Sequence, residues 1–500
     1  MSQTTETAAP TEAESDEAGE REPTLVERTL ANLAVAWRDV AAGAARSVGI
    51  SMPEASDTDA RTLRRLMREC LEARGGEVSA RARAAELGRR YLNLNDSGRR
   101  TFFHILAHDF ASDRERIERA IASVQAAEDD SHRLSAEAQL RRALVPPRVK
   151  LLTQFNALPE GVKFLVDLRA EVLSVAAEDP YLRELERDLS DLLTSWFDVG
   201  FLDLQRITWH SPAALLEKLI AYEAVHEIRD WGDLRNRLDS DRRCFALFHP
   251  RMPEEPLAFV EVALTQEMAG SVQRLLDETA PQDDPASAKT AIFYSISNTQ
   301  KGLRGISFGE YLIKQVVGHL SGELPQIETY ATLSPVPGFR VWLDRAPAGL
   351  LEAMLEDDER KGLVKLSGQQ SPRAALQVLL ARPDWPEDDA VVGVLEAPLK
   401  RLAARYFLER RENGTPLDAV ARFHLKNGAR LERINWLGDV SPKGLRQSAG
   451  IMVNYRYVLD EIEANHEAYM QERRVALGSE VQRLLKGWKD PDGTPLRRMA

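Results

Sequence analysis

The sequence predicts an α+β multidomain fold, in which an all-helical N-terminal half precedes a mixed α/β half. From Leu25 to about Leu193, nearly every segment places apolar residues at helical spacing. After Trp209, short runs rich in β-branched and aromatic residues alternate with turns, as is typical of strands. The chain has 500 residues, enough for roughly two to four domains.

Composition excludes several classes of protein. Residues 1–22 carry seven acidic side chains and one arginine, so they contribute -6 to the net charge of -12, and the rest of the chain contributes the other -6. The remaining chain is only mildly acidic, which disfavours a nucleic-acid-binding surface, and no apolar run approaches the ~18 residues of a membrane-spanning helix. Two cysteines are too few for a disulfide framework, and the first residues lack the pattern of a signal peptide. We therefore expect a cytoplasmic protein that binds neither nucleic acid nor membrane.

The predicted domain boundaries follow these changes in composition. Residues 1–22 form an acidic tail, which we expect to be disordered because it can bury little apolar surface. A helical domain follows at 23–193, an α/β domain at 194–490 and a C-terminal tail at 491–500. Helical bundles without a chemical motif often supply subunit contacts, so we expect the helical domain to form a homo-oligomer, either a dimer or a tetramer.

The helical half contains specific signals. In GVKFLVDLRAEVL, the residues Phe164, Leu165, Leu168 and Val172 fall on one stripe of a helix. Ser112 stands before DRERIERAI, which has acidic residues in its first turn, and predicts a helix start.

One pair of residues in this half could bind a metal ion. His104 and His108 are spaced i and i+4, with Asp109 next, and would lie on one helical face. No other cluster of ligands accompanies them, and the glutamate of the HExxH pattern is absent. The pattern therefore favours ordinary buried or surface histidines that bind no metal ion, and we predict no metal site.

Four runs in the second half predict strands: Cys244–His249, Pro256–Leu264, Thr290–Ser297 and Gln326–Leu333. Between the last two, GEYLIKQVVGHL predicts a helix with an apolar inner face made of Leu312, Ile313, Val316, Val317 and Leu320. Two further helices are predicted at PRAALQVLLA and DAVVGVLEAPLKRLAARYFL.

A glycine-rich loop connects the third strand to its helix. Gly302, Gly305 and Gly309 let backbone N–H groups approach a ligand, and a helix start adds partial positive charge. Arg304 and Lys301 would add cations suited to a pyrophosphate. The spacing matches neither the GxGxxG pattern nor a P-loop, so a purely structural turn remains an alternative.

The segment YATLSPVPGFRVWL raises the question of why a strand ends in a lone hydroxyl. Pro335 biases Ser334 towards an extended conformation, and with Pro337 it stiffens the loop before an aromatic helix start. Such a rigid turn can direct Ser334 into a cleft, although a simple strand-to-helix turn would also explain the pattern.

Two motifs resemble the GCN5-related N-acetyltransferase fold. RGISFGEYLI is similar to that fold's coenzyme A loop, except that Ser307 replaces its middle glycine. AVARFHLKNGARLERI is similar to a helix–glycine–strand motif, with His424 in place of a tyrosine that often protonates the CoA sulfur. The resemblance implies an α/β catalytic domain of acetyltransferase-like fold.

Longer motifs resemble the malonyl-CoA decarboxylase family. They are ITWHSP, FYSISNTQKGLRGISFGEYLIK, LSPVPGF, FHLKNGARLERINW and NYRY, in this order. The resemblance implies a carboxy-lyase of fatty acid metabolism that converts malonyl-CoA to acetyl-CoA and CO2, with coenzyme A as part of the substrate and no separate cofactor. It implies catalytic roles for Ser334 and His424, with Ser295 and Tyr457 lining the acyl pocket. The residues that it implies for binding the CoA phosphates are Arg304, Gly305, Ile306, Ser307, Phe308, Gly309 and Glu310.

These residue types suit the reaction that the resemblance implies. Loss of CO2 leaves an enolate, which the site must stabilise and then protonate. His424 could be the proton donor and Ser334 its partner, which could bind the carboxylate or relay a proton. Without the resemblance, His424 could be a residue at a helix end and Tyr457 a core tyrosine. Two other functions remain open: an acyl-CoA-dependent acyltransferase, and a regulator that binds malonyl-CoA without turnover.

Overall fold

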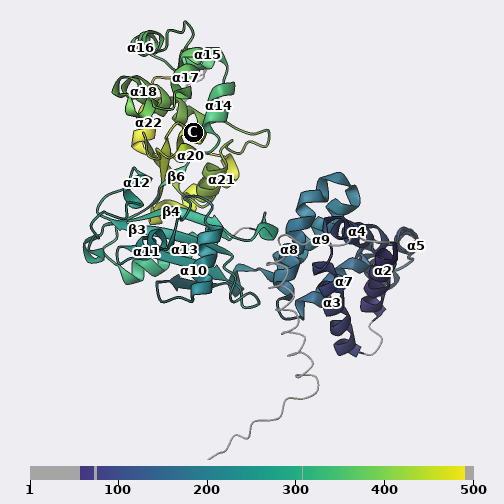
Figure 1. The fold of residues 1–500 in the computed structure, drawn as a ribbon. Coiled ribbons are helices and arrows are strands. Elements are labelled where there is room, and N and C mark those ends of the chain that lie inside the picture. Colours follow the sequence, from purple (N-terminus) through teal and green to yellow (C-terminus); the bar gives the residue numbers. More distant parts are fainter. Residues whose placement is uncertain (1–56, 73–75, 307, 490–500) are drawn as a thin grey trace, which may run out of the picture. The chain divides into compact units, whose positions relative to one another are not determined.

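The computed structural model describes residues 57–72, 76–306 and 308–489. The predicted tails at 1–22 and 491–500, and Ser307, lie outside the described residues. The chain separates into two compact units, Met1–Leu189 and Ser190–Ala500 (Figure 1). In the described part of the chain, no helix has the length and apolar character needed to cross a bilayer.

The described part of the N-terminal unit is helical throughout, as predicted. Its elements are α2 (Asp57–Glu72), α3 (Gly76–Leu92), α4 (Asp96–His104), the π-helix η1 (Ile105–Asp109), α5 (Arg114–Gln125), α6 (Asp130–Leu144), α7 (Pro147–Asn156), α8 (Gly161–Val175), the 3-10 helix η2 (Ala176–Glu178) and α9 (Pro180–Trp196), whose last turns belong to the next unit. The predicted stripe on α8 is confirmed, because all four of its residues are buried. Phe164 of this stripe also belongs to a connected aromatic core, whose other members are Tyr91, Phe102 and Phe155.

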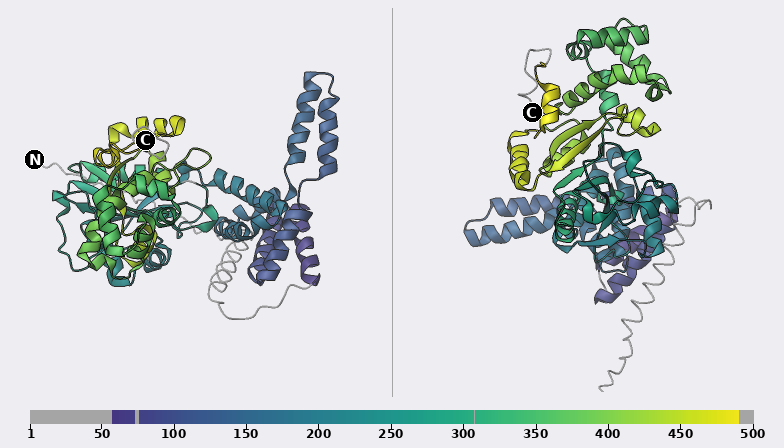
Figure 2. Two further views of the ribbon diagram at one scale, coloured as in Figure 1. Left: turned by 90° about the horizontal axis from the view of Figure 1, so that it is seen from above. Right: turned by 90° about the vertical axis from the view of Figure 1, so that its left-hand side faces the viewer.

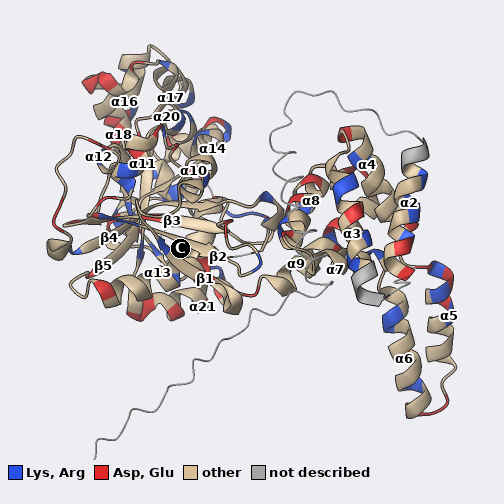
Figure 3. Cartoon of the chain, turned by 60° about the horizontal axis from the view of Figure 1, so that its bottom comes forward, with Lys and Arg blue, Asp and Glu red and all other residues tan. Residues whose placement is uncertain are grey.

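Helices α5 and α6 form an antiparallel pair that extends away from the other helices of this unit (Figure 2). The helix start predicted at Ser112 is wrong by one residue. Asp113 is the N-cap of α5, because its carboxylate accepts the N–H groups of Glu115 and Arg116, while Ser112 donates to the carbonyl of Leu144. Acidic and basic residues are interspersed along the helices of this unit, and many form pairs one turn apart, such as Arg65 with Glu69 (Figure 3).

The described part of the C-terminal unit is built on one sheet of eight strands. They are β1 (Asp203–Ile207), β2 (Arg242–Phe248), β3 (Ala258–Thr265), β4 (Thr290–Asn298), β5 (Thr329–Thr332), β6 (Ser334–Pro335), β7 (Arg430–Asn435) and β8 (Met452–Tyr457). The order is β1-β2-β3-β4-β5-β8-β6, with β7 also paired to β8. The four predicted strands are confirmed as β2, β3, β4 and β5, whereas the mostly exposed edge strand β1 has no counterpart among them.

The described part of this unit also contains α-helices. They are α10 (Ala213–Tyr222), α11 (Trp231–Arg237), α12 (Val272–Leu275), α13 (Gly309–Glu323), α14 (Phe339–Arg345), α15 (Ala348–Ala353), α16 (Asp357–Ser367), α17 (Pro372–Ala381), α18 (Asp389–Tyr406), α19 (Ala419–Lys426), α20 (Pro442–Ser448), α21 (Ile462–Glu472) and α22 (Ser479–Leu485). Cys244, Ala246 and Phe248 of β2 share a core with α10 and α11. Helix α13 buries its predicted apolar face and contacts β2 and β3. Together with the helical N-terminal unit, this mixed sheet confirms the predicted α+β class.

The sheet opens beside β4. Strands β4 and β5 are parallel, while the other pairs are antiparallel. Their pairing ends at Phe293 and Thr332, although β4 continues to Asn298. The chain after Thr332 pairs instead with β8, through Ser334 and Val453. Among the described residues, the second half of β4 therefore has no partner strand on its β5 side.

Candidate active site

A cavity of about 280 Å³ lies where the sheet opens. Its walls come from β4, the β5–β6 junction, α19 and the loop after α10. The lining residues are Val225, Phe293, Tyr294, Ile296, Asn298, Leu333, Ser334, Pro335, Ala419, Val420, Phe423 and His424. Most of these side chains are apolar, so a charge inside the cavity would be poorly solvated, and its interactions with the few polar groups would be strong.

Ser334 and His424 meet in this cavity, 90 residues apart in the sequence. Ser334 Oγ lies 3.3 Å from His424 Nε2 and donates its hydrogen to Thr332 Oγ1 at 2.8 Å. Thr332 Oγ1 also accepts the backbone N–H of Tyr455. Because the Ser334 hydroxyl has one hydrogen and gives it to Thr332, its remaining role towards His424 is that of an acceptor.

Helix α19 and strand β8 hold the histidine ring. Asp418 caps α19 by accepting the N–H of Ala421, and the ring of His424 stacks on Tyr455 with centroids 4.6 Å apart. Tyr457 Oη lies 2.8 Å from His424 Nδ1, and both side chains are buried. When Tyr457 donates to Nδ1, the ring hydrogen lies on Nε2 and points to Ser334. One directed chain of hydrogen bonds then runs from Tyr457 through His424 and Ser334 to Thr332.

Burial sets the protonation states in this chain. It lowers the pKa of His424 to about 3, so the imidazole is neutral near pH 7. Burial raises the pKa of Tyr457 well above its ordinary value, so the phenol keeps its proton and remains a donor. The free site therefore holds a neutral histidine in an apolar cavity.

Ser295 is not among the residues that line the cavity, although its neighbours Tyr294 and Ile296 are. Its hydroxyl donates to both carboxylate oxygens of Glu223, at 2.7 and 2.8 Å, and Ser297 donates to the same carboxylate at 3.0 Å. Along β4 these serines alternate with Ile296 and Asn298, which do line the cavity, so the two sets occupy opposite faces.

Glu223 was not among the residues predicted for the site. Its carboxylate accepts the N–H groups of Val225 and His226 as well as the two serine hydroxyls on β4. It therefore fastens the loop that carries Val225 to the back of the strand that forms the cavity wall. No spacing pattern around Glu223 indicates this role, since its partners on β4 lie more than seventy positions away.

The glycine-rich loop lies at the start of α13. Gly305 has a φ of +90°, a conformation that favours glycine, and Gly309 lies so close to Phe423 that a Cβ there would be 2.3 Å from its ring. Phe423 precedes His424, so this contact packs the helix start against the cavity wall. Arg304 and Lys301 are exposed, which leaves both cations accessible to a ligand.

The other residues of the predicted CoA loop have local roles. Phe308 is buried and occupies the N-cap position of α13, where its side chain cannot cap the first N–H groups. Ile306 is half-buried, and Glu310 forms an ion pair with Lys314 at 3.0 Å, one turn along the helix. The structure thus brings Ser334, His424 and Tyr457 together, and places the loop against the same helix that carries His424.

Comparison with known proteins agrees with this architecture. The family described as malonyl-CoA decarboxylase C-terminal domain matches residues 200–493, and the corresponding N-terminal domain matches residues 110–197. The chain is 38% identical over 421 residues to the mitochondrial malonyl-CoA decarboxylase of Anser anser anser, covering 80% of this chain and 83% of the relative. It is 36% identical over 430 residues to that of Rattus norvegicus, covering 82% and 83%.

Solved structures agree as well. The malonyl-CoA decarboxylase of Rhodopseudomonas palustris superposes with a TM-score of 0.76 at 44% identity, covering 85% of this chain and 99% of the other. That of Agrobacterium vitis gives 0.76 at 43% identity, with the same coverage. The chain is therefore an enzyme of the carboxy-lyase class. It belongs to the malonyl-CoA decarboxylase family, which confirms the resemblance seen in its motifs.

Proposed function

We propose that this chain decarboxylates malonyl-CoA to acetyl-CoA and CO2 through an enolate, with His424 as proton donor and Ser334 as its partner. The observation that carries the proposal is the series of hydrogen bonds from Tyr457 through His424 to Ser334. This series ends in an apolar cavity where the sheet opens. The cavity offers what the reaction needs: mostly apolar walls, a small hydroxyl and an imidazole held in one orientation.

Solvent supplies the proton that the reaction consumes. The malonyl carboxylate enters beside a neutral imidazole, and its negative charge raises the pKa of His424. The ring then takes up a proton from solvent at Nδ1, and the Tyr457 hydroxyl turns to accept that new N–H. The bond between the α-carbon and the carboxylate then breaks, CO2 leaves, and the electron pair delocalises into the thioester carbonyl. Nε2 gives its hydrogen to the α-carbon, which yields acetyl-CoA and a neutral histidine whose remaining hydrogen lies on Nδ1. Exchange of this hydrogen with solvent restores the tautomer of the free enzyme.

Ser334 and Tyr457 have different tasks in this mechanism. Ser334, directly beside Nε2, can turn its hydroxyl from Thr332 to the malonyl carboxylate and hold it out of the thioester plane. Tyr457 contacts the ring nitrogen that faces away from Ser334, Nδ1, and acts as a positioning residue that fixes the tautomer of the free enzyme. Ser295 supports the same wall from behind through Glu223 rather than by contact with substrate.

The loop from Arg304 to Glu310 would bind the CoA phosphates. Its support is the exposed Arg304, the backbone of Gly305 and Gly309, and a helix start without a capping side chain, all packed against the helix that carries His424. We also propose a GCN5-related N-acetyltransferase-like fold for this unit, supported by the parallel β4–β5 pair whose strands separate at the cavity.

The helical domain, which we place at residues 23–193, would mediate homo-oligomerisation. The α5–α6 pair supports this, because Leu134, Leu144 and Val145 are 52–59% exposed on it. The cytoplasmic location stays a prediction, and the Anser and Rattus relatives are named as mitochondrial.

Product analysis tests the proposal directly. Purified protein is incubated with malonyl-CoA in D2O, and the products are identified by mass spectrometry. Decarboxylation releases CO2, leaves CoA acylated and places solvent deuterium on the acetyl methyl group. An acyltransferase would instead release free CoA in the presence of an amine acceptor, and a regulator would bind malonyl-CoA unchanged. Either result would refute the proposal.

A further inference from the structure

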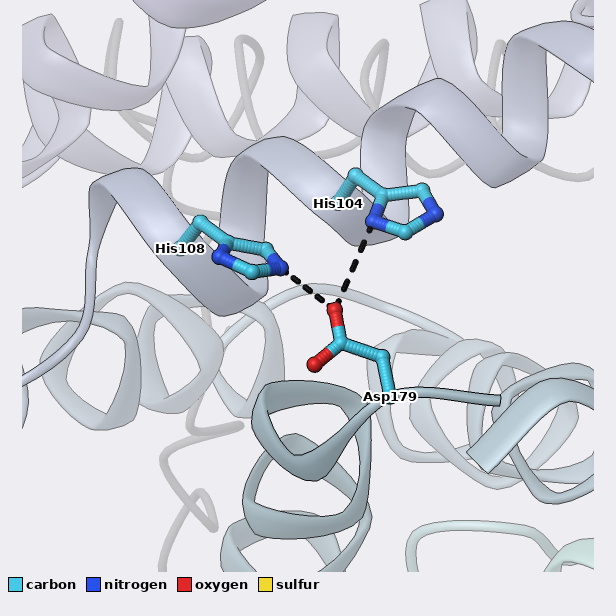
Figure 4. A group of neighbouring side chains, drawn as sticks. All are labelled: His104, His108 and Asp179. Carbon is cyan, nitrogen blue, oxygen red and sulfur yellow. Dashed lines mark hydrogen bonds and ion pairs between the residues drawn. The ribbon is translucent and has the colours of Figure 1, made fainter. Parts of the chain in front are cut away.

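A second cluster of side chains that could carry chemistry lies in the N-terminal unit. It includes none of the residues of the candidate active site. His104 ends α4, His108 lies within η1, and Asp179 precedes α9 (Figure 4). His108 Nε2 lies 2.5 Å from Asp179 Oδ2, and His104 Nδ1 lies 3.8 Å from the same oxygen. With only the two histidines in view, the sequence analysis predicted no metal site. The structure adds a third candidate ligand, Asp179, more than seventy residues after His108.

From this convergence we propose that His104, His108 and Asp179 form a binding site for a divalent transition-metal ion of the Zn²⁺ class. One ligand atom from each of the three side chains lies within 4.8 Å of the other two. Tetrahedral zinc with bonds of 2.0–2.1 Å needs donor atoms about 3.3 Å apart, so only small side-chain rotations are required. Two imidazoles and one carboxylate are a donor set that suits Zn²⁺ better than Mg²⁺ or Ca²⁺.

Neighbouring groups already orient these ligands. The ring of His108 packs against Tyr181 with centroids 4.3 Å apart, and Asp179 Oδ1 accepts the N–H of Tyr181, which leaves Oδ2 directed towards the histidines. Such outer contacts fix the direction of metal ligands. The π-helix matters too, since π-helical turns occur frequently at functional sites.

The local charge and exposure also suit a bound cation. Arg100 on α4 pairs with Glu178, and Arg64 on α2 pairs with Asp109, so the residues that flank the cluster carry balanced charge. The side chains of His104 and His108 are 51% and 40% exposed. A metal ion held by three protein ligands would therefore keep an open position for water, and it would tie the start of α9 to α4 and η1.

The test measures metal binding by the full-length protein rather than its activity. Untagged protein is stripped with EDTA and titrated with Zn²⁺ by calorimetry and with Co²⁺ by visible absorption. We expect one ion per chain, a Co²⁺ spectrum distinct from that of the aqueous ion, and a rise in melting temperature with Zn²⁺. Failure to bind either ion would overturn the proposal.

Variants assign the site. His104→Gln, His108→Gln and Asp179→Asn should each weaken binding at least roughly tenfold, and asparagine retains the capacity to cap α9. His132→Gln is the matched control, because His132 forms a similar exposed pair with Asp129 at 2.7 Å but has no second histidine beside it. Circular dichroism and melting of the metal-free variants verify their folding. Equal affinity in all the variants, or a loss limited to the control, would contradict the assignment.

Discussion

Proton uptake by His424 should accompany binding of the malonyl group. Protonating an imidazole of pKa about 3 at pH 7 costs about 5 kcal/mol, at 1.36 kcal/mol for each pH unit. A carboxylate about 4 Å away stabilises the imidazolium by about 4 kcal/mol at an effective dielectric constant of ~20. The two terms nearly cancel, so we expect a pKa of His424 near 6 in the substrate complex.

Two measurements follow from this value. The first is calorimetry of a CoA thioether that carries a carboxylate but cannot lose CO2, with heats compared in buffers of different ionisation enthalpy. When this thioether binds, the enzyme should take up about half a proton at pH 6 and much less at pH 8. Acetyl-CoA, which lacks the carboxylate, is the control and should take up none. In steady-state kinetics, kcat should fall about tenfold for each pH unit above ~6, because only the protonated histidine can deliver the proton.

His424→Asn separates this mechanism from a general pH effect. The amide is close to imidazole in size and cannot take up a proton in this range, so proton uptake should disappear while the thioether still binds. We expect kcat to fall by roughly 10² to 10⁴, the usual scale for general acid catalysis. Unchanged proton uptake in the variant, or a kcat of the unmodified enzyme that is flat up to pH 9, would show that another group supplies the proton.

Three further outcomes are expected. Tyr457→Phe removes the 2.8 Å bond to His424 Nδ1 and should lower kcat by roughly 10- to 100-fold, matching a loss of about 1–3 kcal/mol, with KM nearly unchanged; an equal rise in KM would point to substrate contact instead. Gly428→Ala should lower the free energy of unfolding by more than ~2 kcal/mol in urea titrations, because φ is +80° and its Cβ would be 2.2 Å from a backbone carbonyl, whereas Gly393→Ala, with open space in a helix, should be neutral or stabilising. Arg304→Ala should weaken CoA and malonyl-CoA alike by roughly 1.5–3 kcal/mol in direct binding measurements, and unchanged CoA affinity would place the phosphate site elsewhere.

Local patterns predicted much of this fold because local forces decide those elements. Strand β4 and helix α13 were predictable, since the apolar run of a buried strand and the periodicity of an amphipathic helix are both visible within a few residues. The start of α5 was missed by one position, because Ser112 and Asp113 are both good N-caps and only the structure shows which side chain turns back onto the helix. Strand β1 was missed because pairing with β2, rather than its own composition, makes it a strand.

The candidate site was predictable from sequence only in part. Motif resemblance selected Ser334, His424 and Tyr457, whose side chains the structure brings together. Glu223 carries no such signal, because its hydrogen bonds to the serines of β4 join residues distant in sequence. Thr332 accepts from Ser334, two positions away, but its second partner, the backbone N–H of Tyr455, is distant in sequence. A single sequence without structure contains nothing that indicates those partners.

The protonation state of His424 shows most clearly what tertiary structure adds. A histidine in a sequence suggests a group that titrates near pH 6.5 and could donate a proton directly. The fold instead places the ring against Tyr455, in an apolar cavity where burial keeps it neutral. In the proposed mechanism the histidine gains its proton only when a negative charge enters, so an acyl-CoA without a carboxylate would bind beside a neutral ring. The attraction between the malonyl carboxylate and the His424 imidazolium would thus do two things at once. It would favour malonyl-CoA over acetyl-CoA, and it would put the catalytic proton on the histidine. Both effects depend on the burial of His424 by the packing of α19 against β8.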